Sequence, residues 1–128
     1  MAEQARRIDV LDTGPRFTAA QVEALNARFA DVPTLAMLRA VLREGLAGDV
    51  AAVSSFGAES AVLLHLIATI DRSVPVLFLD TGKHFPETLD YRDEVMGRLG
   101  MTNLVNLTPN PDALAARDET GLRWSYDP

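Results

Sequence analysis

Residues 50–60 read V-A-A-V-S-S-F-G-A-E-S, and this stretch decides the fold. The apolar run 50–53 predicts a short strand, and an apolar helix is expected to begin near Glu59. Gly57, in the turn between them, permits a positive φ or a close backbone approach to a ligand. The turn and the helix start also carry three hydroxyl side chains, those of Ser54, Ser55 and Ser60.

A strand, a hydroxyl-rich turn and a helix N-terminus in this order predict a cradle for a phosphate or sulfate group. The first N–H groups of a helix have no partner within the helix, and they point toward the turn that precedes it. The alternative is an ordinary strand-to-helix turn in which Ser55 or Ser60 caps the helix. This stretch alone leaves both interpretations open.

Composition excludes several classes of protein. The chain has 128 residues, of which 48% are hydrophobic, so it can bury one core. We expect a loose N-terminal arm at 1–16 and a single α/β domain at 17–128. The net charge of −6 argues against nucleic-acid binding. The apolar run 61–70 is too short to cross a membrane, so we expect a cytoplasmic protein.

Periodicity predicts alternating elements after an initial helical region. Helices are expected at 18–30, 34–46, 59–70, 86–99 and 111–118, and strands at 50–53, 76–79 and 103–107. This order predicts an α/β fold with a parallel sheet. The helix at 59–70 is apolar nearly all round, and the run 74–79 is apolar without a break. The first pattern predicts a helix buried against the sheet, and the second predicts a strand covered on both faces.

A second polar loop follows the strand at 76–79. It reads D-T-G-K-H-F-P-E-T from Asp80 to Thr88. Ligands of parallel sheets bind beyond the carboxyl ends of the strands, where both this loop and 54–60 begin, so the two loops are expected to converge. The charged residues of the following helix, Asp90, Arg92, Asp93 and Glu94, are interpreted as a solvated face.

Four segments carry a resemblance to a known family. S-S-F-G-A-E-S (54–60), L-D-T-G-K-H-F-P-E-T (79–88), Y-R-D (91–93) and W-S-Y-D-P (124–128) resemble the assimilatory sulfonucleotide reductases. These are the adenylyl-sulfate (APS) and phosphoadenylyl-sulfate (PAPS) reductases. The resemblance implies a Rossmann-like fold of the ATP-pyrophosphatase (PP-loop) type, in the adenine nucleotide alpha hydrolase-like group. The A-E-S ending of the first loop is more similar to the APS-using branch.

The resemblance also implies a substrate site. The first loop would hold the phosphosulfate and the second would lie beside the adenosine, with Lys83 and His84 near the mouth. The implied substrate-binding residues are Ser54, Ser55, Phe56, Gly57, Glu59, Ser60, Leu79, Asp80, Thr81, Gly82 and Lys83.

The sequence departs from the family in one respect, because it contains no cysteine. Family members use a C-terminal Cys thiolate as the nucleophile, and APS-using members add Cys pairs that hold a 4Fe-4S cluster. We therefore expect an N-terminal portion that has no catalytic residue, metal or cofactor of its own and binds nucleotide without turnover. The intact enzyme would reduce APS or PAPS to sulfite for cysteine biosynthesis, releasing AMP in the APS case, with thioredoxin or glutathione as electron donor.

Two further expectations concern partners and alternatives. In the fold that the chain resembles, the strand at 50–53 lies mid-sheet beside a strand from the C-terminal half. Without that half it would be an unprotected edge, so we expect a homo-oligomer.

The alternative function is a non-catalytic adenine-nucleotide-binding module of the same fold. ATP-using adenylating enzymes of this fold prefer S-G-G-x-D-S, which Phe56, Ala58 and Glu59 do not match.

Overall fold

The computed structural model describes residues 15–125, except for the side chain of Trp124. The chain divides into two compact units, Met1–Pro33 and Thr34–Pro128. Most of the predicted arm at 1–16 lies outside the described residues. Every described helix is too short or too polar to span a bilayer.

The first unit contains helix α2 (Ala19–Phe29), which begins with a capping box. The Thr18 hydroxyl accepts a hydrogen bond from the Gln21 N–H at 3.2 Å, and the Gln21 side-chain oxygen accepts one from the Thr18 N–H at 2.8 Å. Each side chain therefore satisfies a backbone donor that the helix leaves free.

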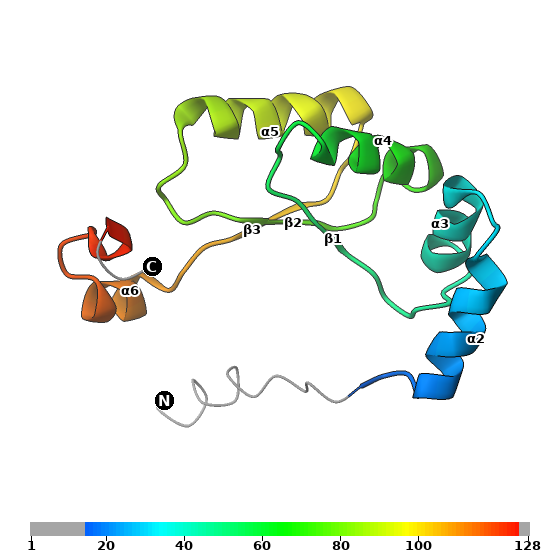
Figure 1. Cartoon of the computed structure of the whole chain (residues 1–128). Coiled ribbons are helices and arrows are strands. Elements are labelled where there is room, and N and C mark those ends of the chain that lie inside the picture. Colours follow the sequence, from blue (N-terminus) through cyan, green and yellow to red (C-terminus); the bar gives the residue numbers. More distant parts are fainter. Residues whose placement is uncertain (1–14, 126–128) are drawn as a thin grey trace. The chain divides into compact units, whose positions relative to one another are not determined.

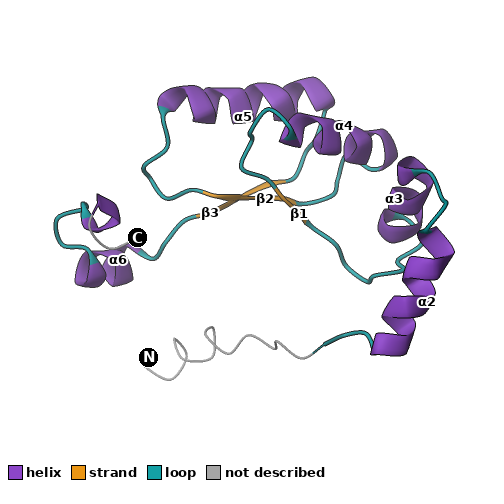
Figure 2. Cartoon of the chain, viewed as in Figure 1, coloured by secondary structure: helices purple, strands orange, loops and turns teal. Residues whose placement is uncertain are grey.

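The second unit is built on a three-stranded parallel sheet in the order β1-β2-β3, which confirms the predicted α/β class (Figures 1 and 2). The strands are β1 (Ala52–Val53), β2 (Val76–Leu79) and β3 (Leu104–Leu107). Strand β1 is shorter than predicted. Pro75 accepts a hydrogen bond from the Ala52 N–H at 2.8 Å but has no N–H to donate, which limits the ladder at this end.

Helices α4 (Ser60–Ile70) and α5 (Pro86–Leu99) pack on the same face of the sheet (Figure 1). Helix α3 (Thr34–Leu42) packs against α4 and is shorter than predicted, because the chain already turns at Gly45, where φ is +66°. Helix α6 (Pro111–Arg117) and a 3-10 turn, η1 (Arg123–Ser125), follow β3. The core between helices and sheet contains Phe56, Leu64, Ile67, Ala68, Val74, Val76, Phe78, Val95, Met96 and Met101.

Helix α4 is buried against the sheet as predicted, but the cover predicted on both faces of β2 is wrong for the described part of the chain. In α4, Val62 and Leu63 are exposed although Leu64 and Ile67 are buried. In β2, Val76 and Phe78 point into the core, whereas 59% of Leu79 is exposed. The helix and the strand are apolar on both sides, but the helices of this unit cover only one face of the sheet.

Candidate functional site

The two predicted loops leave the sheet from the same edge, on neighbouring strands. Strands β1 and β2 are parallel and hydrogen-bonded, so the segments that follow them begin side by side. The Ser54 N–H donates to the Leu77 carbonyl at 3.0 Å, and the Asp80 N–H donates to the Leu107 carbonyl at 2.9 Å. The carboxyl edge of the sheet therefore brings the two loops together, as expected.

The first loop, residues 54–60, is shaped by Ser54 and Phe56. The Ser54 hydroxyl is buried and accepts a hydrogen bond from the Phe56 N–H at 3.1 Å. Phe56 has a φ of +56°, a conformation that non-glycine residues seldom adopt. The positive φ that the sequence suggested for Gly57 therefore occurs one residue earlier, and the buried Phe56 ring anchors the loop edge-on against Phe78 at 5.7 Å.

This arrangement leaves backbone donors free at the start of α4. The Ser60 N–H donates to the Gly57 carbonyl at 3.0 Å, but within residues 15–125 the N–H groups of Gly57, Ala58 and Glu59 have no acceptor. No side chain caps α4, so the alternative in which Ser55 or Ser60 caps this helix is wrong. Adjacent free N–H groups at a helix N-terminus are suited to an anion.

The second loop, residues 80–85, is held by its own side chains. The Asp80 carboxylate accepts a hydrogen bond from the Gly82 N–H at 2.9 Å, and the Thr81 hydroxyl accepts one from the Lys83 N–H at 3.3 Å. Gly82 supplies a φ of +74° for the turn. The Lys83 ammonium donates to the Gly121 carbonyl, so in this structure it is engaged with the segment 118–125.

Not every predicted residue lies on the same side of the sheet. Side chains alternate along β2, and Leu79 lies on the face opposite Phe78 and the core. Ser55, Gly57 and Glu59 are exposed, as are Thr81, Gly82 and Lys83, whereas Ser54 and Phe56 are buried and support the loop from within.

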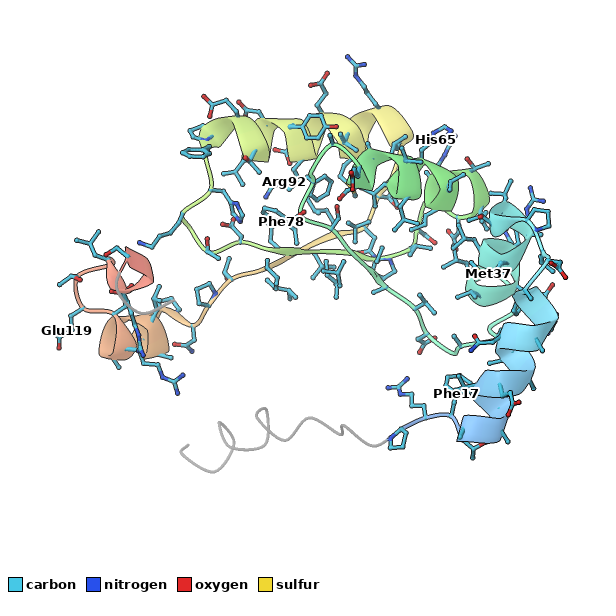
Figure 3. All side chains as sticks on the ribbon, viewed as in Figure 1. Phe17, Met37, His65, Phe78, Arg92 and Glu119 are labelled. Carbon is cyan, nitrogen blue, oxygen red and sulfur yellow. The ribbon has the colours of Figure 1, made fainter. Side chains whose placement is uncertain are left out.

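Two side chains outside the list of predicted substrate-binding residues, those of His84 and Arg92, lie next to Phe78. Figure 3 shows Arg92 and Phe78. The His84 ring lies 4.9 Å from the Phe78 ring, and its Nε2 forms a hydrogen bond with the Leu79 carbonyl at 2.9 Å. The Arg92 guanidinium lies 5.1 Å from the Phe78 ring, and only 11% of its side chain is exposed.

The solvated face predicted for α5 is therefore wrong at Arg92, although its charged neighbours Asp90, Asp93 and Glu94 are exposed. A signal for this was present in the sequence. Arg92 falls three residues after Leu89 and three before Val95, on the inward stripe of the helix.

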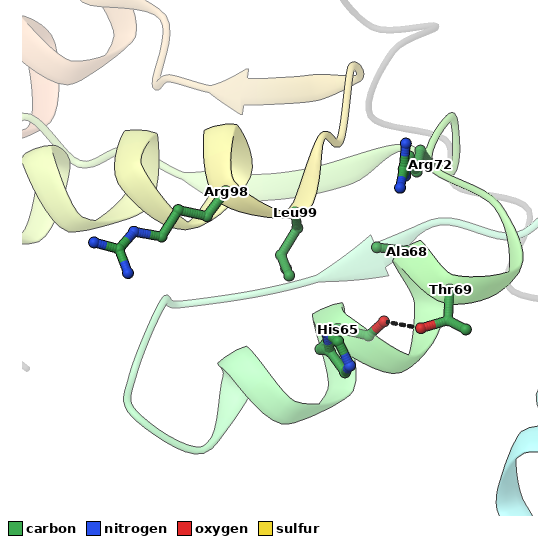
Figure 4. A pocket seen from close by; sticks show the side chains of 6 residues that line it. All are labelled: His65, Ala68, Thr69, Arg72, Arg98 and Leu99. Carbon is green, nitrogen blue, oxygen red and sulfur yellow. Dashed lines mark hydrogen bonds between the residues drawn. The ribbon is translucent and has the colours of Figure 1, made fainter.

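A separate hollow of about 150 Å³ lies between the C-terminal halves of α4 and α5 (Figure 4). It is lined by His65, Ala68, Thr69, Arg72, Arg98 and Leu99. The Arg72 and Arg98 side chains point away from each other, and Arg98 pairs with Glu94 at 2.8 Å. Because helix C-termini carry partial negative charge, this hollow is less suited to an anion than the two loops.

The residues present do not fit an iron–sulfur cluster. Such clusters are held chiefly by Cys thiolates, and the sequence has none. Within residues 15–125 no group of three or more His, Asp or Glu side chains is arranged to hold a metal ion.

Comparison with known proteins places this geometry in a family. Residues 49–125 match the family model described as the phosphoadenosine phosphosulfate reductase domain. An adenosine 5'-phosphosulfate reductase of Mesorhizobium japonicum is 46% identical over 121 residues, which cover 94% of this chain and 48% of the relative. An adenosine 5'-phosphosulfate reductase of Chelativorans sp. is 50% identical over 107 residues, which cover 81% of this chain and 44% of the relative.

More distant matches carry the related name. A phosphoadenosine 5'-phosphosulfate reductase of Vibrio cholerae is 42% identical over 66 residues, 52% of this chain and 26% of the relative. A crystal structure of phosphoadenylyl-sulfate (PAPS) reductase from Candida auris, a phosphate complex, superposes with a TM-score of 0.65 at 22% identity, covering 89% of this chain and 56% of that one. This likeness supports the fold. The chain spans about half the length of the APS reductases it matches.

Proposed function

Because the chain belongs to the phosphoadenosine phosphosulfate reductase domain family, we propose that it forms the nucleotide-binding part of an adenylyl-sulfate reductase. Such an enzyme reduces activated sulfate to sulfite. The match to two APS reductases extends over most of the chain, whereas the match to a PAPS reductase extends over about half of it. This difference favours APS as the substrate.

The observation that carries the proposal is the row of free N–H groups at Gly57, Ala58 and Glu59, one strand away from the Asp80–Gly82 turn. The N–H groups would bind the phosphosulfate of APS, or the phosphate of AMP, and the second loop would contact the adenosine. The neighbouring crystal structure is itself a phosphate complex, which is consistent with an anion site in this fold.

The sulfur chemistry is assigned to the whole enzyme and not to these residues. Reduction by the thiol route requires a thiolate to attack sulfur, and the sequence contains no cysteine. We therefore place binding, but no catalytic residue, on this chain. For the whole enzyme we propose thioredoxin or glutathione as electron donor and a cytoplasmic role in sulfate assimilation.

Isothermal titration with AMP and with APS tests the proposal, using the wild-type chain and Gly57→Val. Within residues 15–125, a Cβ added at Gly57 would meet only the Ser55 hydroxyl, at 3.8 Å, so the fold should tolerate the substitution. Its methyl groups would instead obstruct an anion above the free N–H groups. We expect binding to weaken by more than about tenfold, or about 1.4 kcal/mol.

Gly97→Val is the matched control, because Gly97 lies on α5 and, within residues 15–125, a Cβ added there meets no atom outside the helix backbone within 4 Å. It should leave the affinity for AMP unchanged. Absence of binding by folded wild-type protein, or equal affinities for wild type and Gly57→Val, would refute the proposed anion site.

A further inference from the structure

The proposed site contains little unengaged positive charge for an anion. The chain carries a net charge of −6, and Glu59 and Asp80 both lie in the two loops. Lys83, the only lysine in the sequence, is engaged with the Gly121 carbonyl. Besides the free N–H groups at the start of α4, a charged side chain other than Lys83 is therefore needed to add positive potential to the site.

Arg92 is in a position to supply it. Helix α5 starts where the second loop ends, so its N-terminus lies at the carboxyl edge of the sheet, and helical side chains lean toward the N-terminus. The guanidinium reaches Asn106 in β3, donating from Nη1 to the amide oxygen at 3.2 Å. Figure 3 shows Arg92 and Phe78 between α5 and the sheet.

The Arg92 guanidinium and one residue of each loop lie against the same aromatic ring, that of Phe78. Its guanidinium carbon is 5.1 Å from the Phe78 ring, and that ring is 5.7 Å from the Phe56 ring of the first loop, so the charge lies at most about 11 Å from the Phe56 ring. The His84 ring of the second loop contacts the same Phe78 ring at 4.9 Å. At such a distance a charge in a poorly solvated environment still acts on another.

The counter-charge of Arg92 is weak. Its Nε donates to the Asp93 carboxylate at 2.9 Å, but Asp93 is 63% exposed, so water screens that carboxylate more than it screens the guanidinium. Its other hydrogen bond goes to the neutral Asn106 amide. A mostly buried cation with a screened partner leaves net positive potential on the side of the loops.

We propose that Arg92 is a binding residue that acts at a distance: its buried positive charge holds the phosphate or phosphosulfate of the nucleotide above the two loops without touching it. The inference rests on the proposed function, because it assigns the anion to the same site. It predicts that Arg92 discriminates between charged and uncharged forms of one ligand.

AMP and adenosine provide that comparison, since they differ only in the phosphate. In Arg92→Met, which removes the charge and keeps the length of the side chain, AMP should bind about five- to tenfold more weakly, while the affinity for adenosine changes by less than about twofold. Arg92→Lys should retain AMP affinity to within about threefold, because it keeps the charge.

Arg98→Met is the matched control, since it removes the same charge from the exposed far end of the same helix. It should change neither affinity by more than about twofold. Thermal unfolding of each variant reports whether it is folded. If Arg92→Met does not fold, the comparison is made with Arg92→Lys and with wild type at rising salt, where affinity for AMP should fall and affinity for adenosine should not.

The outcomes separate the inference from the proposed function. An equal loss of AMP and adenosine affinity in Arg92→Met would show that Arg92 supports the loops structurally, and would overturn the inference. Unchanged AMP affinity, or an equal effect of Arg98→Met, would also overturn it while leaving the proposed function intact. Wild-type protein that binds neither ligand would overturn both.

Discussion

Phe56 determines the shape of the first loop at the level of a single residue. Its φ of +56° is unfavourable for a side chain with a Cβ, and burial of its ring in the core compensates for this cost. Replacing Phe56 by Ala should lower the free energy of unfolding by about 3 kcal/mol, because it leaves a cavity beside Phe78. Urea denaturation followed by circular dichroism measures this loss.

The Phe56→Gly variant isolates the backbone contribution. Glycine adopts positive φ without strain, whereas alanine does not, so Phe56→Gly should be about 1 kcal/mol more stable than Phe56→Ala. In an ordinary extended or helical position the order would be reversed. A glycine variant less stable than the alanine variant would therefore contradict the conformation described for Phe56.

Sequence reasoning located this loop but assigned its unusual conformation to the wrong residue. Gly57 was the natural candidate for a positive φ, because local preference favours glycine there. The structure places the strain at Phe56 because a buried ring and the Ser54 hydroxyl, neither of which is visible in local spacing, over-determine that position. Arg92 was misassigned for the opposite reason, since its charge was given more weight than its place on the inward stripe of α5.

At the scale of elements, the C-terminal end of α4 is held by a compact polar turn. The N–H of Asp71, which follows the helix, donates to the Ile67 carbonyl at 2.8 Å, and the Arg43 guanidinium donates to the Ile70 carbonyl. The Asp71 carboxylate accepts hydrogen bonds from the Ser73 hydroxyl at 2.6 Å and the Ser73 N–H at 2.8 Å. These bonds satisfy carbonyl groups that the helix leaves free and fix the turn into β2.

This turn gives the unfolding free energy a pH dependence. The Ser73 hydroxyl and N–H, helped by the charge of Arg43, hold the pKa of Asp71 below its ordinary value of 3.8. A carboxyl group with a lowered folded-state pKa stabilises the protein above its unfolded pKa, and this contribution is lost as the pH falls through the folded pKa. Ser73→Ala should raise the pKa of Asp71 and reduce the loss of stability in acid.

Carboxyl-carbon NMR titration measures the Asp71 pKa directly, and urea denaturation over the same pH range measures the stability. Asp71→Asn is the control, because Ser73→Ala should then have no effect on the acid limb. An Asp71 pKa that is unchanged in Ser73→Ala would show that the hydroxyl does not stabilise the carboxylate.

Element boundaries were predictable where a local residue fixes them. Helix α5 begins at Pro86 and ends before Gly100, which has a φ of +66°, as its sequence predicts. Helix α3 ends early because Gly45, and not only Gly48, adopts a positive φ. Strand β1 is short because its ladder is limited by Pro75, which directly precedes β2 and so cannot be read from the sequence of β1.

At the scale of the second unit, the sheet presents an apolar surface on the face opposite α4 and α5. Side chains alternate along the strands, so the residues that point away from the core lie in register across the sheet. They are Val53, Leu77, Leu79, Val105 and Leu107. Of these, Val53 is 67% exposed and Leu107 is 42% exposed. The unbroken apolar pattern of β2 correctly indicated that both faces are apolar, but it could not show what covers the second face.

An apolar face on a parallel sheet favours association, because such sheets are normally covered on both sides. We therefore predict that the 128-residue chain forms a homo-oligomer in which this face packs against a second copy. Light scattering coupled to size exclusion at micromolar concentration should give a mass above 13.9 kDa for wild type. Leu107→Lys should shift the mass toward that of the monomer, because it places a charge in the apolar face.

Val62→Lys is the matched control, since Val62 is an exposed apolar residue on α4, away from this face. A wild-type monomer at all concentrations, or equal dissociation by both lysine substitutions, would rule out this face as the interface.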